Sequence, residues 1–519
     1  MKKLPGIFND VISPVMRGPS SSHTAASWRI ARIGLDILNK PLQKALVEFD
    51  REGAWAPNYR EQGTTMGMNG GLLGLDITDE RMKDTESYAQ KKGIAIEYKI
   101  SSFETNHANT VRLTLWGKSQ KKAQIIAVSL GGGSFEIRSV DGFPVQLNGD
   151  LYSMLIFSKN NPDQSEELKS VLLSGIEFSS ENKEETIKYE LKSSHSFPSE
   201  LITQLQKHPV VDEIALIHPI MPVIGGRESE MPFKSVQSLI DYAEENSADL
   251  GDIGLIYEKY ISGLPEQELI QKMEEIIQII HKSIVTGMAG TSYEDRILQQ
   301  QSHLIEKAEK EGKIKDSVIN RMIANVSAIM ESKSSMEVIV AVPTAGSCGT
   351  VGGSLKAISE NLGSSKDELI KAYFAAGIVG AYFAQGPGFS AEEHGCQVEC
   401  GAASGMAAAG IAHLMGGTAK QAIGAASMAI QNMIGLVCDP VADRVEVPCL
   451  GKNISAAVNA YASAIMAVSG YDFVIPLDQV IKTVSRVSKT MPNCVKCTGK
   501  GGLAITEEAI KLKLKLAQK

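Results

Sequence analysis

The sequence predicts a multi-domain protein with an N-terminal α/β (α+β) domain, a central βαββαβ domain and a C-terminal, mainly α-helical domain. Three observations predict this organisation. The chain has 519 residues, more than one domain usually contains. Apolar runs typical of strands alternate with helical patterns up to Ile217. From Ser235 to the end, apolar residues at helical spacing dominate.

Residues 1–149 form the first predicted domain. Apolar runs at 45–49 and 123–130 are typical of strands, and residues 25–38 carry apolar side chains at the spacing of an amphipathic helix. Because helical and strand patterns are interleaved, this part is predicted to be an α/β or α+β unit.

The second predicted domain, residues 150–222, has its own order of elements. We expect strands at 151–158, 176–179, 186–191 and 211–217, with helices at 165–173 and 199–208. This βαββαβ order is the split βαβ pattern of ferredoxin-like domains. Residues 223–234 lie in a stretch rich in Pro and Gly and are predicted to be a linker.

The third predicted domain, residues 235–519, is mainly helical. Apolar spacing predicts helices at 241–246, 267–287, 291–329 and 366–385. Seven of the twenty residues from Gly401 to Lys420 are Ala and five are Gly, so helix backbones can approach closely there. Close helix packing alone, and packing around a bulky prosthetic group, both explain this composition.

The charge balance excludes some partners. The chain carries 52 Lys and Arg against 60 Asp and Glu, a net charge of −8. Nucleic acid is not an expected partner, because its binding needs a basic surface. The basic N-terminus lacks the apolar segment of a secretory signal, and the uncharged stretch 372–391 contains Gly and Pro, as in a buried helix followed by a turn. We therefore expect a cytoplasmic protein without a membrane partner.

All seven cysteines lie in the last third of the chain. Cys396, Cys438 and Cys449 each stand near Gly or Pro in a predicted loop or helix end, where free backbone N–H groups stabilise thiolates. Three such thiolates can hold an iron-sulfur cluster that leaves one iron without a protein ligand. Buried thiols that pack as small apolar side chains are the alternative. Cys494 and Cys497 form a CxxC motif without a second copy, which argues against zinc.

Longer motifs connect the last third of the chain to a known family. The segment from Gly395 to Asn453 contains GCQVE, LMGGT, GLVCDPVA and VEVPC, and resembles the catalytic domain of iron-sulfur-dependent L-serine dehydratases (L-serine ammonia-lyases). VPTAGSCG from Val342 to Gly349 is similar to the PTAGSCG motif of that family, and residues 499–504 are similar to its GxGGLA ending.

The first part of the chain resembles the other, β-type domain of the same family. Residues 18–25 read GPSSSHTA, a signature of that domain, and His107-Ala-Asn109-Thr110 is similar to its HPNT motif. The resemblance therefore implies a single chain with fused β-type and α-type domains. The central domain is similar to a degenerate regulatory ACT domain, in which residues 160–163, Asn-Asn-Pro-Asp, replace the usual Gly-containing ligand turn.

The resemblance implies a lyase of amino-acid metabolism, with a role in gluconeogenesis, that deaminates L-serine to pyruvate and ammonia. Cys396, Cys438 and Cys449 match the ligands of a [4Fe-4S] cluster, whose fourth iron would assist loss of the β-hydroxyl as a Lewis acid. The implied catalytic residues are His107, Ser20, Ser21, Ser22, His23 and Thr24, with His107 as the acid or base. The implied substrate-binding residues are Asn109, Thr110, Gln62, Arg60, Thr344, Gly346 and Ser347.

The sequence also departs from the family pattern. The family commonly has GHGT in its β-type domain, but Gln62 stands here in place of the histidine and Arg60 adds a charge nearby. Glutamine is no general base, so the same elimination on another small hydroxy acid or amino acid is the alternative. Some relatives close the open iron with a C-terminal cysteine. This chain ends Leu-Ala-Gln-Lys, and only Cys494 or Cys497 offers a substitute.

Two further hypotheses remain at this point. A pyridoxal phosphate dehydratase would use Gly346 to Gly353 as its phosphate cradle, but no lysine near that loop marks a Schiff base. A non-catalytic sensor would bind an amino acid in the ACT-like domain and report oxygen or iron through the cluster. The family resemblance favours an enzyme that acts as a homodimer on L-serine or a similar small molecule.

Overall fold

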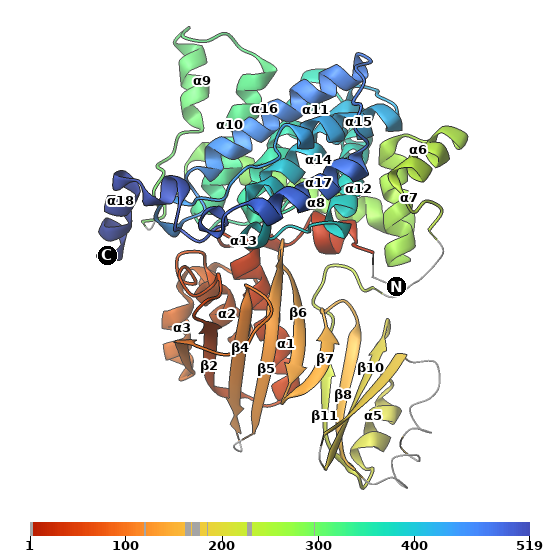
Figure 1. Cartoon of the computed structure of the whole chain (residues 1–519), viewed down its shortest axis with the longest axis vertical. Helices are drawn as coiled ribbons and strands as arrows, with labels where there is room; N and C mark the ends of the chain where they lie inside the picture. Colours follow the sequence, from red (N-terminus) through yellow and green to blue (C-terminus); the bar gives the residue numbers. More distant parts are fainter. Residues whose placement is uncertain are drawn as a thin grey trace.

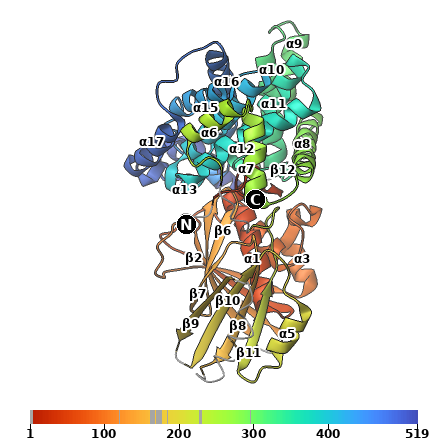
Figure 2. The same cartoon turned by 90° about the vertical axis from the view of Figure 1, so that its right-hand side faces the viewer.

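A computed structural model describes residues 4–118, 121–160, 168, 177–183, 185–225, 231–294 and 296–518. A helical body occupies one end of the molecule, a six-stranded sheet lies against it, and a four-stranded sheet occupies the other end (Figures 1 and 2). The prediction of a multi-domain, mixed α/β protein with a helical C-terminal region is therefore confirmed.

The six-stranded sheet belongs to the first part of the chain and has the order β3-β2-β4-β5-β6-β7. All neighbouring pairs are antiparallel except β2 with β3. Helix α1 packs on this sheet, and Gly34 lets its backbone approach, since a Cβ there would lie 3.2 Å from Leu115. The elements are α1 (Ala26–Leu38), β2 (Leu42–Asp50), α2 (Thr64–Leu72), α3 (Thr85–Lys92), β3 (Ala95–Ser101), β4 (Thr110–Gly117), β5 (Lys122–Gly131), β6 (Ser134–Val140) and β7 (Phe143–Leu147).

The four-stranded sheet follows in the chain. Its order is β11-β8-β10-β9 with antiparallel neighbours, and its elements are β8 (Tyr152–Lys159), β9 (Glu177–Lys183), β10 (Thr186–Ser193), α5 (Ser199–Gln206) and β11 (Val211–Ile217). The predicted strands and the second predicted helix are found here. The first predicted helix, 165–173, lies outside the described residues except for Leu168.

The last part of the chain is helical. Of its predicted helices, 366–385 coincides with α12, whereas a single helix over 291–329 is wrong. Two helices stand there, because Gly312 adopts φ +70 after the first and Ser317 caps the second. The helices are α6 (Val236–Glu245), α7 (Leu250–Ser262), α8 (Glu266–Ala289), α9 (His303–Lys310), α10 (Val318–Ser334), α11 (Cys348–Leu362), α12 (Lys366–Gln385), α13 (Ala391–His394), α14 (Cys400–Leu414), α15 (Ala419–Gln431), α16 (Cys449–Val468), α17 (Leu477–Thr490) and α18 (Glu507–Ala517).

Small residues let these helices pack closely. Helix α14 is buried along nearly its whole length and contacts α12, α15 and α16. A Cβ on Gly410 would lie 2.9 Å from the carbonyl oxygen of Ala372 in α12, so the two backbones nearly touch. The Ala and Gly content predicted this close packing. Among the described helices, none is both long enough and apolar enough to span a membrane.

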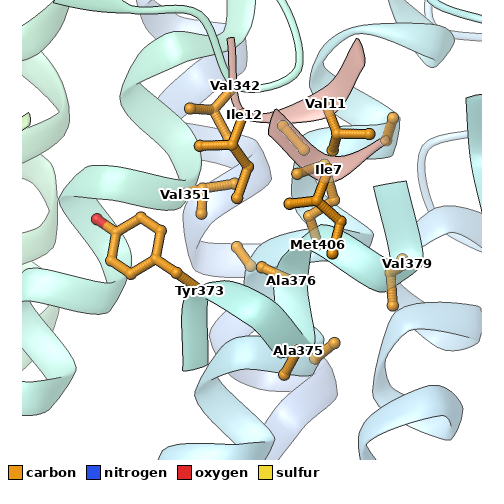
Figure 3. Packing of buried hydrophobic residues seen from close by; sticks show 14 of the residues in the cluster. Ile7, Val11, Ile12, Val342, Val351, Tyr373, Ala375, Ala376, Val379 and Met406 are labelled. Atoms are coloured by element: carbon orange, nitrogen blue, oxygen red, sulfur yellow. The ribbon is translucent and has the colours of Figure 1, made fainter. Parts of the chain in front are cut away.

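The N-terminal segment is part of the helical core. Ile7, Val11 and Ile12 lie among Tyr373, Met406 and their neighbours (Figure 3). Two glycines of α12 provide the space: a Cβ on Gly377 would lie 2.6 Å from Ile7, and one on Gly380 would lie 2.2 Å from Val11. β1 (Val15–Met16) then pairs with β12 (Ile339–Val340). The N-terminal segment therefore packs into the helical part of the molecule before the six-stranded sheet begins.

The start of this segment is anchored by polar contacts. The Glu258 carboxylate accepts a hydrogen bond from the Ile7 N–H at 2.6 Å, and the Tyr257 hydroxyl donates to the Pro5 carbonyl at 2.7 Å. Burial raises the pKa of Glu258 to about 7, in spite of the N–H groups that favour its charged form. The segment thus enters the helical core at a fixed point on α7.

Candidate functional site

A polar turn follows β1 and leads into α1. Residues Ser21–Ala25 form a short turn of π-type helix, η2, and all five are buried. Gly67 lets α2 pack directly against this turn, because a Cβ at this position would lie only 2.0 Å from the carbonyl oxygen of Thr24. The predicted run from Ser20 to Thr24 is therefore an ordered, buried loop at the beginning of α1.

His23 is the centre of a hydrogen-bond network in this loop. Its Nδ1 lies 3.0 Å from the Ser20 hydroxyl and 3.1 Å from the Ser22 hydroxyl, and its Nε2 lies 3.1 Å from Asn58 Oδ1. Because the amide nitrogen of Asn58 donates to the Cys497 carbonyl, its oxygen faces the ring. The network therefore places the proton of neutral His23 on Nε2 and leaves Nδ1 as the acceptor.

A carboxylate from the helical domain completes the network. Glu392 in α13 accepts from the Ser22 hydroxyl at 2.7 Å and lies 3.5 Å from His23 Nδ1. Desolvation lowers the pKa of His23, although Glu392 partly offsets this. Desolvation also acts to raise the pKa of Glu392, but His23 and the hydroxyl groups that donate to it lower the pKa overall. The two domains thus meet at a buried histidine and carboxylate.

A second histidine and carboxylate pair lies nearer to solvent. His107 Nδ1 accepts the Asn109 N–H at 3.1 Å, and Nε2 lies 3.6 Å from Glu393. Burial lowers the pKa of His107, opposed by Glu393. Since Nδ1 is an acceptor, neutral His107 carries its proton on Nε2. The Thr110 hydroxyl holds the loop by donating to the His107 carbonyl at 2.7 Å.

Asn109 has an unusual environment for an amide. Its side chain is fully buried, yet neither the amide oxygen nor the amide nitrogen has a hydrogen-bond partner among the described residues. Buried amides in proteins are nearly always paired. A ligand that binds beside His107 would be able to supply the missing partner.

The three predicted cluster ligands are buried thiols from different segments. Cys396 follows α13, Cys438 lies in the loop after α15, and Cys449 begins α16. Gly395 adopts φ +74 and would bring a Cβ within 2.9 Å of the Leu436 carbonyl, so glycine lets the loop of Cys438 approach Cys396. The sulfur atoms of Cys396 and Cys438 and a carboxylate oxygen of Glu399 lie within 4.8 Å of one another.

The thiols favour a bound cation. Desolvation and the nearby Cys396 thiol raise the pKa of Cys449. Hydrogen bonds with Cys396 and Cys497 raise the pKa of Cys438. The Lys452 ammonium partly offsets the raised pKa of Cys449, and its Nζ lies 3.9 Å from Cys396 Sγ and 2.8 Å from Asp439 Oδ1. Soft thiolates gathered in a buried, partly compensated site are the donor set that iron-sulfur clusters and soft metals prefer.

The C-terminal CxxC segment closes the site from the other side. Cys497 is buried against Cys396 and Cys438, and the Gln62 side chain of the first domain donates to its sulfur at 3.6 Å. Cys494 is exposed. In the same segment, the Leu503 N–H donates to Asp439 at 2.9 Å. The GxGGLA ending is therefore packed on the loop of Cys438.

A further loop joins the thiols to the serine turn. Thr344 and Ser347 cap each other, and the Thr344 hydroxyl donates to Glu399 at 2.7 Å. Gly346 is required here, because a Cβ would lie 2.8 Å from the Glu399 carboxylate. The Ala345 N–H donates to the Ser21 hydroxyl at 3.1 Å. Motifs from both ends of the sequence thus form one site.

One predicted site residue lies apart from the others. The Arg60 side chain is more than half exposed, stacks over Tyr59 and lies 3.6 Å from Glu86. Sequence reasoning missed four residues that contact the predicted ones: Asn58, Glu392, Glu399 and Lys452. The acidic residues adjoin or lie within the matched GCQVE motif, which was the available signal, whereas Asn58 is brought in only by folding.

Comparisons with known proteins identify the family of the chain. The family described as "Serine dehydratase alpha chain" matches residues 80–504. The chain is 34% identical over 285 residues to the probable L-serine dehydratase alpha chain of Bacillus subtilis, covering 55% of this chain and 95% of that one. It is also 36% identical over 147 residues to the beta chain from the same organism, covering 28% of this chain and 66% of that one. L-serine dehydratase 1 of Escherichia coli is 32% identical over 282 residues, 53% of this chain and 62% of that one.

Proposed function

The chain belongs to the serine dehydratase family, and from this premise we propose that it is a [4Fe-4S]-dependent L-serine ammonia-lyase that forms pyruvate and ammonia. The observation that carries the proposal is the junction of the buried thiols with the serine and histidine turn at one interdomain site. Matches to both alpha and beta chains support fusion of the two chain types in one polypeptide.

Cys396, Cys438 and Cys449 would hold the cluster. Their burial, the raised pKa values of Cys438 and Cys449 and the charge of Lys452 support this assignment. When bound, such a cluster supplies a Lewis-acidic iron that favours departure of the substrate hydroxyl. The protein supplies the remaining parts, which are proton transfer, substrate orientation and exclusion of water.

His23 is the base of the proposed reaction. Its unprotonated Nδ1 accepts a hydrogen bond from the Ser20 hydroxyl, while the Ser22 hydroxyl donates to Glu392. A proton taken from the Cα of L-serine would therefore reach His23 through the Ser20 hydroxyl. The Glu392 carboxylate stabilises the imidazolium that forms, as a buried carboxylate does in a catalytic triad.

His107 is the complementary acid. Its Nε2 carries the proton and lies beside Glu393, so the ring would donate a hydrogen bond to the substrate hydroxyl and stabilise the charge that develops on it as it departs.

The substrate carboxylate is assigned to the small-residue loops. Hydroxyl and N–H donors of the Ser20–Thr24 turn and of Thr344, Gly346 and Ser347 face the junction of the two domains. The unpaired amide of Asn109, with Thr110 and Gln62 beside the same loops, would complete recognition. We leave Arg60 out of the proposed site, because its side chain pairs with Glu86.

An anaerobic assay tests the proposed function. The purified protein, reconstituted with iron and sulfide, is expected to be brown and to release pyruvate from L-serine. A panel of other hydroxy amino acids and hydroxy acids tests the alternative that Gln62 marks a different substrate. Rapid turnover of another panel member with no turnover of L-serine would favour that alternative. A colourless protein with full activity would remove the cluster from the proposal.

Asn109→Ala tests substrate recognition. We expect KM for L-serine to rise about tenfold or more, because the lost amide pairs only with the ligand. The melting temperature is expected to change little, since no described hydrogen bond is lost. Ser158→Ala, which also removes a buried polar group without a described partner, is the matched control and should leave KM unchanged. An unchanged KM in Asn109→Ala would contradict the assignment.

We propose domain bounds of 1–149, 150–222 and 235–519, with the N-terminal segment packed into the third domain. The order of the four-stranded sheet supports an ACT-like second domain. The seven unpaired cysteines support a cytoplasmic location. A homodimer rests on the family resemblance alone, and light scattering tests it.

A further inference from the structure

A cavity of about 330 Å³ lies where the first domain meets the segment after the four-stranded sheet. Its floor is one face of α1, where Trp28, Arg32 and Asp36 follow one another at four-residue spacing. The turn around Leu75 forms one wall, and residues 218–220, which follow β11, form the other. The serine turn lies at the beginning of α1, and Asp36 lies near the end of this helix.

The charges in this cavity are of both signs and are incompletely paired. The half-buried Arg32 guanidinium has no hydrogen bond or ion pair with any described residue. Asp36 is held in place by His218. The backbone nitrogen of His218 lies 2.9 Å from Asp36 Oδ2, and its ring Nδ1 lies 3.1 Å from the same oxygen. Asp76 is held by the Thr78 N–H and hydroxyl, both on Oδ1. Each carboxylate therefore keeps one oxygen without a described partner.

We propose that this cavity binds a small zwitterionic α-amino acid, separately from the site of the chemistry. Arg32 would take the carboxylate, because a guanidinium matches a carboxylate with two parallel hydrogen bonds. Asp36 and Asp76 would take the ammonium group. The volume is at the lower end of ligand pockets, which span roughly 300–1,000 Å³, so the ligand is small.

The apolar part of the lining fits the same ligand class. Trp28 is fixed by a hydrogen bond from its ring N–H to the Leu75 carbonyl at 2.8 Å. Ile33, Leu75 and Ile220 also line the cavity. These side chains leave a short apolar surface between the two charged ends, suited to a small amino-acid side chain. A dianion such as phosphate is disfavoured, since two carboxylates face a single arginine.

Calorimetric titration of the full-length, cluster-loaded protein tests the proposal. The probes are glycine, L-alanine, L-valine and L-threonine, with inorganic phosphate as an anion without an ammonium group. We expect one of the amino acids to bind and phosphate not to bind. In Arg32→Gln the dissociation constant is expected to rise between about tenfold and a hundredfold. Binding is expected to persist in Ser22→Ala, because Ser22 belongs to the proposed active site.

Arg486→Gln is the matched control. It makes the same change of charge at an exposed arginine of α17, and the dissociation constant should match that of the unaltered protein. Trp28→Phe provides a second readout, since a fluorescence change on binding should be lost in this variant. Binding lost in Ser22→Ala but kept in Arg32→Gln would place the ligand in the active site and overturn the proposal. Failure of every probe to bind would also overturn it, without bearing on turnover of L-serine.

Discussion

Cys438→Ser is expected to lose the iron-sulfur cluster and at least about a thousandfold of its serine turnover, because Lewis-acid assistance supplies several kcal/mol of barrier reduction. Cys438 is held between two neighbours, with its N–H donating to the Val495 carbonyl at 2.8 Å and its carbonyl accepting the Cys497 N–H at 2.9 Å. A serine keeps these backbone contacts, so only the thiolate is removed. Iron and sulfide content, the visible absorbance and pyruvate release measure the effect.

Two other cysteines serve as controls for this result. Cys494 is exposed, and Cys348 is buried against Met330 with its sulfur 3.8 Å from Sδ. Cys494→Ser and Cys348→Ser are expected to retain the cluster and the turnover. A Cys438→Ser protein with the full iron content and unchanged activity would show that these thiols only pack the interior.

His23→Asn is expected to lower kcat by about a hundredfold to ten-thousandfold, the usual contribution of a positioned base. Glu392→Gln should lower kcat less, because it removes only the charge that stabilises the imidazolium. His303→Asn, at an exposed position on α9, is the matched control and should leave kcat unchanged. Near-normal turnover in His23→Asn would show that a group other than His23 removes the Cα proton.

The pH profile separates a base from a structural histidine. Burial lowers the pKa of His23 below its ordinary value of 6.5, so the ring is neutral and able to accept a proton at pH 7. We expect kcat/KM to fall as the pH decreases through this lowered pKa, on the acid side of 6.5. In Glu392→Gln the charge that raises the pKa of His23 is lost, so this acid limb should move to still lower pH. A limb that does not move would contradict the coupling of the two groups.

Local patterns in the sequence predicted the regular elements well. The apolar spacing of 366–385 coincides with α12, because a buried helix with a capping Ser365 is specified by adjacent residues. The predicted helix 291–329 is wrong, since apolar spacing continues across Gly312 although the backbone there cannot remain helical without cost. A periodic pattern alone does not report such a break.

The sequence displays the motifs of the candidate site, but it does not reveal the contacts between them. The thiols and the serine turn carry signatures that a single sequence displays. Asn58, by contrast, lies in a turn without any periodicity, and its amide reaches both His23 and the Cys497 carbonyl only because two domains dock. The pairing of Ser22 with Glu392 depends on the same docking. Long-range contacts of this kind leave no trace in local spacing.

The position of the N-terminal segment has a consequence for how the protein is made. Ile7 and Val11 leave the ribosome several hundred residues before the α12 and α14 residues that enclose them. The helical core therefore cannot close until synthesis is nearly complete, and contacts of such large sequence separation form slowly. Until then the apolar side chains of Ile7 and Val11 stay exposed to solvent and can promote aggregation.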